Sequence, residues 1–265
     1  MSSIDEALKQ SKRVHFIGIG GSGMTPLAEI LLAKGYTLTG SDNNPGDNID
    51  KLRGLGVEII MAQKAENLSL LKPDMIVYTV AVLPDNEELV AAKNSGIPCF
   101  ERADLFGAVT RLFENCICIC GTHGKTTSTS MLSQILLESG ADPTLVIGGK
   151  LPLIDAHGRA GKSQTMVAEA CEFDDHFLKL SPNTTVLLNI DDDHLEYFKT
   201  MDNLIASFTK FINMTTDTVI FNGDDANTLT AIENADHKNG KTFISFGLRP
   251  ENDYTAAGIS YHRGA

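Results

Sequence analysis

The residues best suited to bind a phosphate group are "GTHGKTT", from Gly121 to Thr127. They follow the apolar run 116–120 and precede a helix-like segment, 126–139, so the turn joins a predicted strand to a predicted helix. Turn amides can surround a phosphate, Lys125 can reach the β- and γ-phosphates, and the Thr126 hydroxyl can bind Mg²⁺. A complete P-loop pattern requires glycine at position 119, where this chain has isoleucine. The stretch is therefore interpreted as a shortened P-loop.

Acidic residues follow the next predicted strands. Glu169 ends the segment "TMVAEA", Glu172 comes three residues later, and Asp191-Asp192-Asp193-His194 follows "TTVLLNI". Strand ends on one edge of a parallel sheet converge, so these groups could complete a Mg²⁺ shell with phosphate oxygens and water. The alternatives are a solvated acidic loop and, for His194 alone, a surface or core role.

The segment Asp174-Asp175-His176 is a further metal candidate. Its context, "EFDDHFLKL", favours a different interpretation, a helix start at which aspartate caps the first turn.

A second glycine-rich turn lies near the start of the chain. Gly18-x-Gly20-x-x-Gly23 matches the dinucleotide fingerprint, in which glycines permit a tight turn and a close approach of the backbone to a pyrophosphate. Asp42 stands 19 residues after Gly23, at the end of the next predicted strand, where it could bind a ribose hydroxyl. NAD, FAD and other nucleotide diphosphates remain open at this point, as does a glycine turn used only for packing.

Alternating strands and helices must position these turns. In the first part of the chain we expect strands at 14–19, 36–39, 57–60 and 75–79. We expect helices at 24–34 and 87–94, and between them a helix whose last residues are 52–56. In the second part we expect strands at 116–120, 165–171, 184–190, 217–222 and 242–248, helices at 126–139 and 203–213, and a loop at 151–164. This alternation predicts an α/β fold, with an N-terminal Rossmann-like, doubly wound parallel sheet followed by a partial P-loop domain. The predicted domains are 1–107 and 108–265.

Composition excludes several classes of protein. The chain has 265 residues, 42% of them hydrophobic and 21% charged, which indicates a globular protein. A formal net charge of −12 argues against a nucleic-acid or anionic-membrane partner. The sequence shows no apolar run long enough to span a bilayer and no signal peptide, so a cytoplasmic location is expected. Cys116, Cys118 and Cys120 are interpreted as small hydrophobic residues of a buried strand rather than metal ligands.

Together the two turns and the acids resemble the Mur ligase family of peptidoglycan synthesis. "HFIGIGGSGMTPLAEILLAKGYTLTGSD" is similar to that family's opening, and "NEELVAAKNSGIPCFERADL" to the close of its first domain. "GTHGKTT" is similar to its ATP loop, and "VAEACEFDDHFL" and "NIDDDHLEYF" to its central-domain motifs. The resemblance covers roughly residues 12 to 260. It implies a cell-wall enzyme that uses ATP, Mg²⁺, UDP-N-acetylmuramate and L-alanine and forms an amide through an acyl phosphate.

The resemblance also implies a role for individual residues. The UDP-sugar would bind at Gly18, Gly20, Gly21, Ser22, Gly23 and Asp42. ATP would bind at Gly121, Thr122, His123, Gly124, Lys125, Thr126, Thr127 and Asn189, the last facing the adenine. Mg²⁺ would bind Thr126, Glu169 and His194, and the catalytic groups would be Lys125, Glu169 and His194.

The sequence departs from the family at several points. Cys171 stands where the family often has aspartate, and Lys210 does not align convincingly with the carbamylated lysine of some members. The family normally has a third domain, so we expect this chain to be a fragment that binds the UDP-sugar and does not ligate alanine by itself. Besides the ligase function that the resemblance implies, two functions remain open: a nucleotide- or UDP-sugar-binding fragment without ligase activity, and an NAD-dependent oxidoreductase that uses only the first unit.

Overall fold

The computed structural model describes residues 3–237 and 240–260. These residues form two compact units. The first contains the residues up to Phe113 together with Ser133–Met166, and the second contains Glu114–Leu132 together with the residues from Val167 onward. Helix α6 (Arg102–Thr110) runs through position 107, where the sequence predicts a domain boundary. That boundary stays a prediction.

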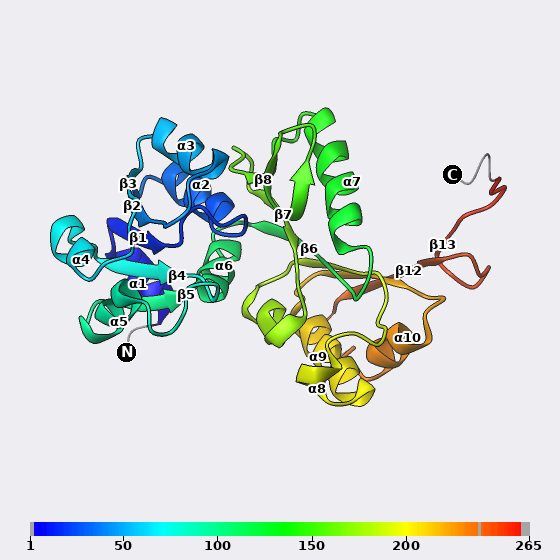
Figure 1. The fold of residues 1–265 in the computed structure, drawn as a ribbon. Coiled ribbons are helices and arrows are strands. Elements are labelled where there is room, and N and C mark those ends of the chain that lie inside the picture. The colour runs from blue at the N-terminus through cyan, green and yellow to red at the C-terminus, as the bar shows by residue number, and fades with distance from the viewer. Residues whose placement is uncertain (1–2, 238–239, 261–265) are drawn as a thin grey trace. The chain divides into compact units, whose positions relative to one another are not determined.

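The first unit is built on a parallel sheet with the strand order β3-β2-β1-β4-β5 (Figure 1). Its elements are α1 (Ile4–Gln10), β1 (Arg13–Ile17), α2 (Thr25–Ala33), β2 (Thr37–Ser41), α3 (Asp47–Gly54), β3 (Glu58–Ile60), α4 (Glu66–Leu71), β4 (Met75–Tyr78), α5 (Glu87–Asn94), β5 (Cys99–Glu101) and α6, and later β7 (Thr144–Leu151) and β8 (Ala156–Arg159). The order reverses between β1 and β4, which is the switch point at which doubly wound sheets bind ligands. The predicted α/β class is confirmed.

The second unit contains strands in the order β13-β12-β11-β10-β6-β9. Its elements are β6 (Asn115–Cys120), α7 (Lys125–Glu138, which continues into the first unit), β9 (Thr165–Glu169), the 3-10 helix η1 (Phe173–Lys179), β10 (Thr184–Leu187), α8 (Leu195–Phe198), α9 (Met201–Met214), β11 (Thr218–Asn222), α10 (Ala226–Glu233), β12 (Thr242–Gly247) and β13 (Tyr254–Thr255). Strand β10 is parallel to both β6 and β11. The segments after β9, β6 and β10 therefore emerge from neighbouring strands.

The predicted loop at 151–164 is wrong, because β7 and β8 form an antiparallel hairpin there. A Cβ on Gly158 would lie 2.3 Å from the Leu145 carbonyl oxygen and 2.9 Å from Pro26. This strand packs through its backbone, so it lacks the alternating apolar side chains that identify a strand in sequence.

The predicted aspartate cap at 174–175 is also wrong. Asp174 and Asp175 lie inside η1 with left-handed φ values of 54° and 56°. The Asp175 carboxylate instead accepts hydrogen bonds from Tyr197 and Ser207, which come from α8 and α9. Tertiary partners replace the local capping bond.

The three cysteines of β6 are buried free thiols, as the structural interpretation of this strand expects. The hydrogen bond with Cys116 is the main cause that raises the pKa of Cys118, and burial raises it further. Burial raises the pKa of Cys120. Because thiolates are the reactive form, these groups act as small apolar side chains. None of the described helices is long and apolar enough to cross a membrane.

Aromatic packing joins η1 to α9 in the core of the second unit. Phe177 is 1% exposed, stacks on Phe211 with ring centroids 4.7 Å apart, and meets Phe208 edge-on at 5.2 Å. We expect Phe177→Ala to lower the free energy of unfolding by about 3–5 kcal/mol, because it removes a buried ring and leaves a cavity. Urea unfolding of this variant and of Leu248→Ala, an exposed control, measures the effect. Equal stability of the two variants would contradict this assignment of the core.

Candidate functional site

The turn after β6 requires glycine at two positions. Gly121 and Gly124 adopt φ values of 133° and 82°, which favour glycine. A Cβ on Gly121 would lie 3.0 Å from the backbone nitrogen and oxygen of Asn189, so only glycine allows this approach to the segment after β10. Helix α7 then begins at Lys125, and its N-terminal amides lie at the turn.

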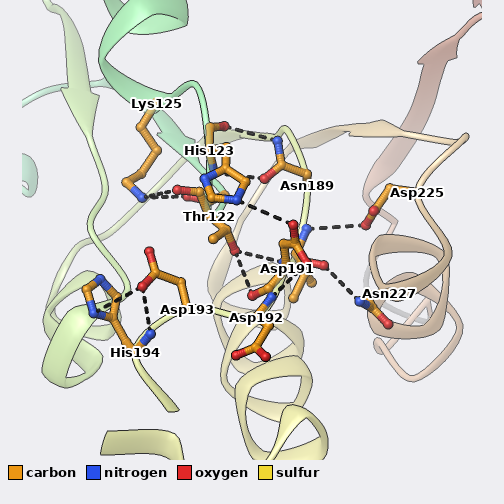
Figure 2. Close-up of polar contacts among 12 residues, drawn as sticks. Thr122, His123, Lys125, Asn189, Asp191, Asp192, Asp193, His194, Asp225 and Asn227 are labelled. Atoms are coloured by element: carbon orange, nitrogen blue, oxygen red, sulfur yellow. Dashed lines mark hydrogen bonds and ion pairs between the residues drawn. The ribbon is translucent and has the colours of Figure 1, made fainter. Parts of the chain in front are cut away.

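Asn189 holds this turn through its side-chain amide. Its Oδ1 accepts from the His123 backbone N–H at 2.8 Å, and its Nδ2 donates to the His123 carbonyl at 3.0 Å (Figure 2). Its backbone carbonyl accepts from the Thr122 N–H at 3.0 Å. The structure thus places Asn189 against the loop backbone, and its contact with adenine stays a prediction.

Lys125 curls back over the turn from which it starts. Its Nζ donates to the carbonyl oxygens of Gly121 at 2.7 Å and Thr122 at 3.0 Å, and it pairs with Glu172 at 3.0 Å. Glu172 is 1% exposed, so this lysine neutralises a buried carboxylate. A phosphate entering the turn would compete with these partners for the ammonium group.

Two groups of possible metal ligands lie beside the loop. The Thr126 hydroxyl donates to Glu169 Oε1 at 2.8 Å, as expected for strand ends that converge. Possible ligand atoms of Glu172, Asp193 and His194 all lie within 4.8 Å of one another. The structure therefore brings together two members of the predicted set, Thr126 and Glu169, and places His194 with Glu172 and Asp193. The assignment of all three predicted residues to one ion stays a prediction.

Backbone contacts fix the acidic segment after β10. The Asp191 N–H donates to Thr122 Oγ1 at 2.9 Å, Asp225 accepts from the Ile190 N–H at 3.2 Å, and Asn227 donates to the Ile190 carbonyl at 2.8 Å (Figure 2). These contacts attach the segment both to the phosphate loop and to the start of α10. These contacts fix the backbone of the segment, whereas the side chains of Asp191 and Asp192 are exposed, so a solvated acidic loop stays an alternative.

His194 is held by an aromatic ring. Phe173 lies edge-on to it with ring centroids 4.9 Å apart, and Nδ1 lies 3.5 Å from the Glu196 carboxylate and 3.7 Å from that of Asp193. The residue has a left-handed φ of 56°, a conformation that is uncommon outside glycine but that histidine adopts more often than most residues.

The first glycine turn borders a cavity of about 910 Å³ in the first unit. Its lining includes Gly18, Gly20, Gly21, Asp42, Asn43, Asn44, Asp47, Asn48, Lys51, Gln63, Thr79, Val82, Asp85, Asn86, Lys150, Asp155 and His157. The turn follows β1 and Thr79 follows β4, so the cavity lies at the switch point of the sheet. Four of the six predicted UDP-sugar residues line it, whereas Ser22 lines a smaller cavity and Gly23 faces Arg102.

Asp42 is occupied by the backbone around it. Its carboxylate accepts from the Gly20 N–H at 2.8 Å and from the Asn44 N–H at 3.0 Å, and the residue is 8% exposed. Asp42 therefore shapes the glycine turn, and its predicted bond to a ribose hydroxyl stays a prediction. Sequence reasoning did not select Gln63, Asn86, Lys150 or His157, because distant loops carry them and no local motif marks them.

The sequence leaves the roles of Cys171 and Lys210 open. Cys171 is exposed to solvent, and partial desolvation by its neighbours raises the pKa of its thiol, which weighs against a reactive thiolate. Lys210 is exposed on α9.

Adding one methyl group at Gly18 tests whether the first glycine turn contacts the ligand. Gly18 has φ +81°, and a Cβ there would lie 2.8 Å from Thr79 Cγ2. If this turn binds the UDP-sugar that the family resemblance implies, Gly18→Ala should weaken that binding on the order of tenfold, because a left-handed alanine costs about 1–2 kcal/mol before the clash is relieved. Calorimetry measures the affinity. Gly54→Ala is the matched control, since that helical glycine has open space around it. Unchanged binding by Gly18→Ala would mean that the ligand does not use this turn.

Comparison with known proteins agrees with this geometry. A family model described as "Mur ligase family, catalytic domain" matches residues 13–114, and one described as "Mur ligase middle domain" matches residues 119–265. The chain therefore belongs to the Mur ligase family.

Two curated relatives with the same enzyme name are similar to nearly the whole of this chain. The UDP-N-acetylmuramate–L-alanine ligase of Caldanaerobacter subterraneus subsp. tengcongensis is 41% identical over 96% of this chain and 54% of that protein. The enzyme of the same name from Acetivibrio thermocellus is 43% identical over 95% of this chain and 53% of that protein. This chain thus spans about half the length of the curated relatives it matches.

Solved structures show the same fold. The UDP-N-acetylmuramate–alanine ligase of Thermotoga maritima matches with a TM-score of 0.75 and 29% identity, covering 89% of this chain and 53% of that one. The UDP-N-acetylmuramate:L-alanyl-gamma-D-glutamyl-meso-diaminopimelate ligase of Neisseria meningitides matches with a TM-score of 0.77 and 25% identity, covering 89% and 78%.

Proposed function

We propose that this chain provides the UDP-sugar and ATP sites of an ATP-dependent ligase that joins L-alanine to the carboxylate of UDP-N-acetylmuramate in peptidoglycan synthesis. The observation that carries the proposal is the turn after β6, where Lys125 and Thr126 lie beside the carboxylates of Glu172 and Glu169. The names of the similar proteins support the choice of substrates. Because ATP is a substrate, the proposal includes a cytoplasmic location.

The reaction we propose has two steps. The muramate carboxylate attacks the γ-phosphorus of ATP, the bond to the β-γ bridging oxygen breaks, and ADP leaves with the bond's electron pair. The alanine amine then attacks the acyl phosphate carbonyl, and phosphate leaves as the amine loses its proton. Lys125 holds positive charge at the turn throughout, and the turn amides orient the phosphates for in-line transfer.

The residues present fit a magnesium ion. The hydroxyl of Thr126 and the carboxylates of Glu169, Glu172 and Asp193 are hard oxygen donors of the kind that Mg²⁺ prefers. Thr126 and Glu169 would hold one ion, and Glu172, Asp193 and His194 offer further ligands. When bound, Mg²⁺ would neutralise charge on the phosphate oxygens.

The cavity of the first unit suits a nucleotide sugar. Its volume of about 910 Å³ lies within the usual range for small-molecule sites. Side-chain amides of Asn43, Gln63 and Asn86 offer both donors and acceptors, which a uracil ring and sugar hydroxyls require. The glycine turn offers backbone amides to a diphosphate.

Binding and turnover test the proposal with the 265-residue chain. We expect calorimetry to show binding of UDP-N-acetylmuramate and of ATP with Mg²⁺. Binding of NAD with no response to the UDP-sugar would refute the proposal in favour of an oxidoreductase. We expect no phosphate release from the 265-residue chain that depends on L-alanine, and robust alanine-dependent release would contradict that expectation.

A further inference from the structure

A buried carboxylate lies behind the wall of the cavity in the first unit. Glu88, in the first turn of α5, is 0% exposed and does not line the cavity. Its Oε1 accepts from His15 Nε2 and from Asn67 Nδ2, both at 2.9 Å, and its Oε2 accepts from Ser41 Oγ at 2.5 Å. His15 is also fully buried, and its Nδ1 lies 2.9 Å from Thr39 Oγ1. One carboxylate thus joins β1, β2, α4 and α5.

Each of these partners is connected to a segment that lines the cavity. Ser41 immediately precedes Asp42, where the lining segment 42–49 begins. Asn67 also donates to the Ala62 carbonyl at 2.7 Å, next to the lining residue Gln63. The backbone N–H of Glu88 itself donates to Asn86 Oδ1 at 3.1 Å, at the end of the lining segment 79–86. His15 lies on β1, three residues before the glycine turn.

The same segments also meet at the cavity surface. Gln63 Oε1 accepts from Asn43 Nδ2 at 3.0 Å and from Asn86 Nδ2 at 2.9 Å, and the Gln63 N–H donates to Asn43 Oδ1 at 3.2 Å. These three side chains line the cavity. Their amides must turn correctly for a ligand to find donors and acceptors in place. The amide side chains at the cavity surface therefore belong to the same segments that the buried hydrogen bonds of Glu88 connect.

We propose that Glu88 is a positioning residue for the nucleotide-sugar ligand, which sets three loops of the cavity wall in their binding arrangement before the ligand enters. The assignment of the ligand rests on the proposed function, whereas the coupling of the loops does not. A carboxylate can accept from all three donors at once, but a glutamine at this position would turn an NH₂ group toward at least one of them. The geometry of the wall, and with it the orientation of the bound ligand, depends on this charge.

The test uses Glu88→Gln, which keeps the size of the side chain, in the 265-residue chain. Hydrogen exchange without ligand is the first measurement. We expect faster amide exchange in all three segments, 42–49, 62–63 and 79–86, for Glu88→Gln. Ser41→Ala should affect mainly 42–49, and Asn67→Ala mainly 62–63, because each removes a single connection. The proposal would be overturned if, in Glu88→Gln, any of the three segments kept the amide exchange rate of the wild type.

Binding of UDP-N-acetylmuramate by calorimetry is the second measurement. We expect Glu88→Gln to weaken the affinity on the order of tenfold. The control is Thr110→Val, which removes another buried hydrogen bond, from Thr110 Oγ1 to the Gly107 carbonyl at 2.7 Å, in a helix that does not line the cavity. Thr110→Val should lose stability and keep its affinity. Equal affinity of Glu88→Gln and wild type would overturn the role in positioning. A wild-type chain that does not bind the UDP-sugar would refute the proposed function instead, and the exchange measurement would still decide whether Glu88 couples the loops.

Discussion

Replacing Lys125 with methionine is expected to lower ATP-dependent phosphate release on the order of a hundredfold or more. The ammonium group would be one of the positive charges at the transferred phosphoryl group, and removing one such stabilising group from an active site typically has an effect of this size. The measurement is phosphate release with saturating UDP-N-acetylmuramate, together with calorimetry of ATP binding.

This substitution also leaves Glu172 buried without its cation, which would destabilise the fold. The double variant Lys125→Met/Glu172→Gln, compared with Glu172→Gln alone, separates the two effects, because it removes the uncompensated charge while the single variant shows what Glu172 itself contributes. We expect it to recover stability but not phosphate release. Lys241→Met is the matched control, since the Lys241 ammonium group also donates to two backbone carbonyls, those of Ile212 and Asn213, in the same unit. Full activity of the double variant would refute the role assigned to Lys125.

The second large effect is expected at Glu169. Glu169→Gln keeps a hydrogen-bond partner for the Thr126 hydroxyl at the end of β9 but removes the negative charge. Because Mg²⁺ binding depends on ligand charge, the Mg²⁺ concentration needed for half-maximal ATP binding should rise on the order of tenfold or more. Titration of Mg²⁺ at fixed ATP measures the shift.

Two further variants, one of them a control, test whether Glu169 and His194 bind the same Mg²⁺ ion. Glu138→Gln, at the far end of α7, is the control, because that carboxylate is exposed and accepts a hydrogen bond from Gln134. His194→Ala should raise the Mg²⁺ requirement as well if His194 and Glu169 serve the same ion. An unchanged requirement in Glu169→Gln would show that β9 does not supply a metal ligand.

The sequence by itself predicted the elements whose signals are local. The strand 14–19, the helix 24–34 and the helix 87–94 correspond closely to β1, α2 and α5. The phosphate loop was predicted for the same reason. Its glycines, its lysine and its position between a strand and a helix are all contained within a few neighbouring residues.

The hairpin formed by β7 and β8 could not be predicted in this way. Gly158 contributes no side chain, and the strand exists because its backbone fits closely against Leu145 and Pro26, which are distant in sequence. The left-handed pair Asp174 and Asp175 has a similar explanation, because Tyr197 and Ser207 provide hydrogen bonds that no neighbouring residue provides. In both cases tertiary contacts outweigh the local preference.

The candidate sites divide along the same line. Residue types and spacing predict that one turn binds a nucleotide diphosphate and the other the phosphates of ATP, since each motif would act through adjacent backbone amides. Only the tertiary structure decided which distant groups join them: Glu172 beside Lys125, Glu169 beside Thr126, and Glu88 behind the cavity wall. The physical reason is that a charge or a hydrogen bond acts over a few ångströms of space. Strand order, which brings separate parts of the chain within that distance, does not appear in the spacing of residues along it.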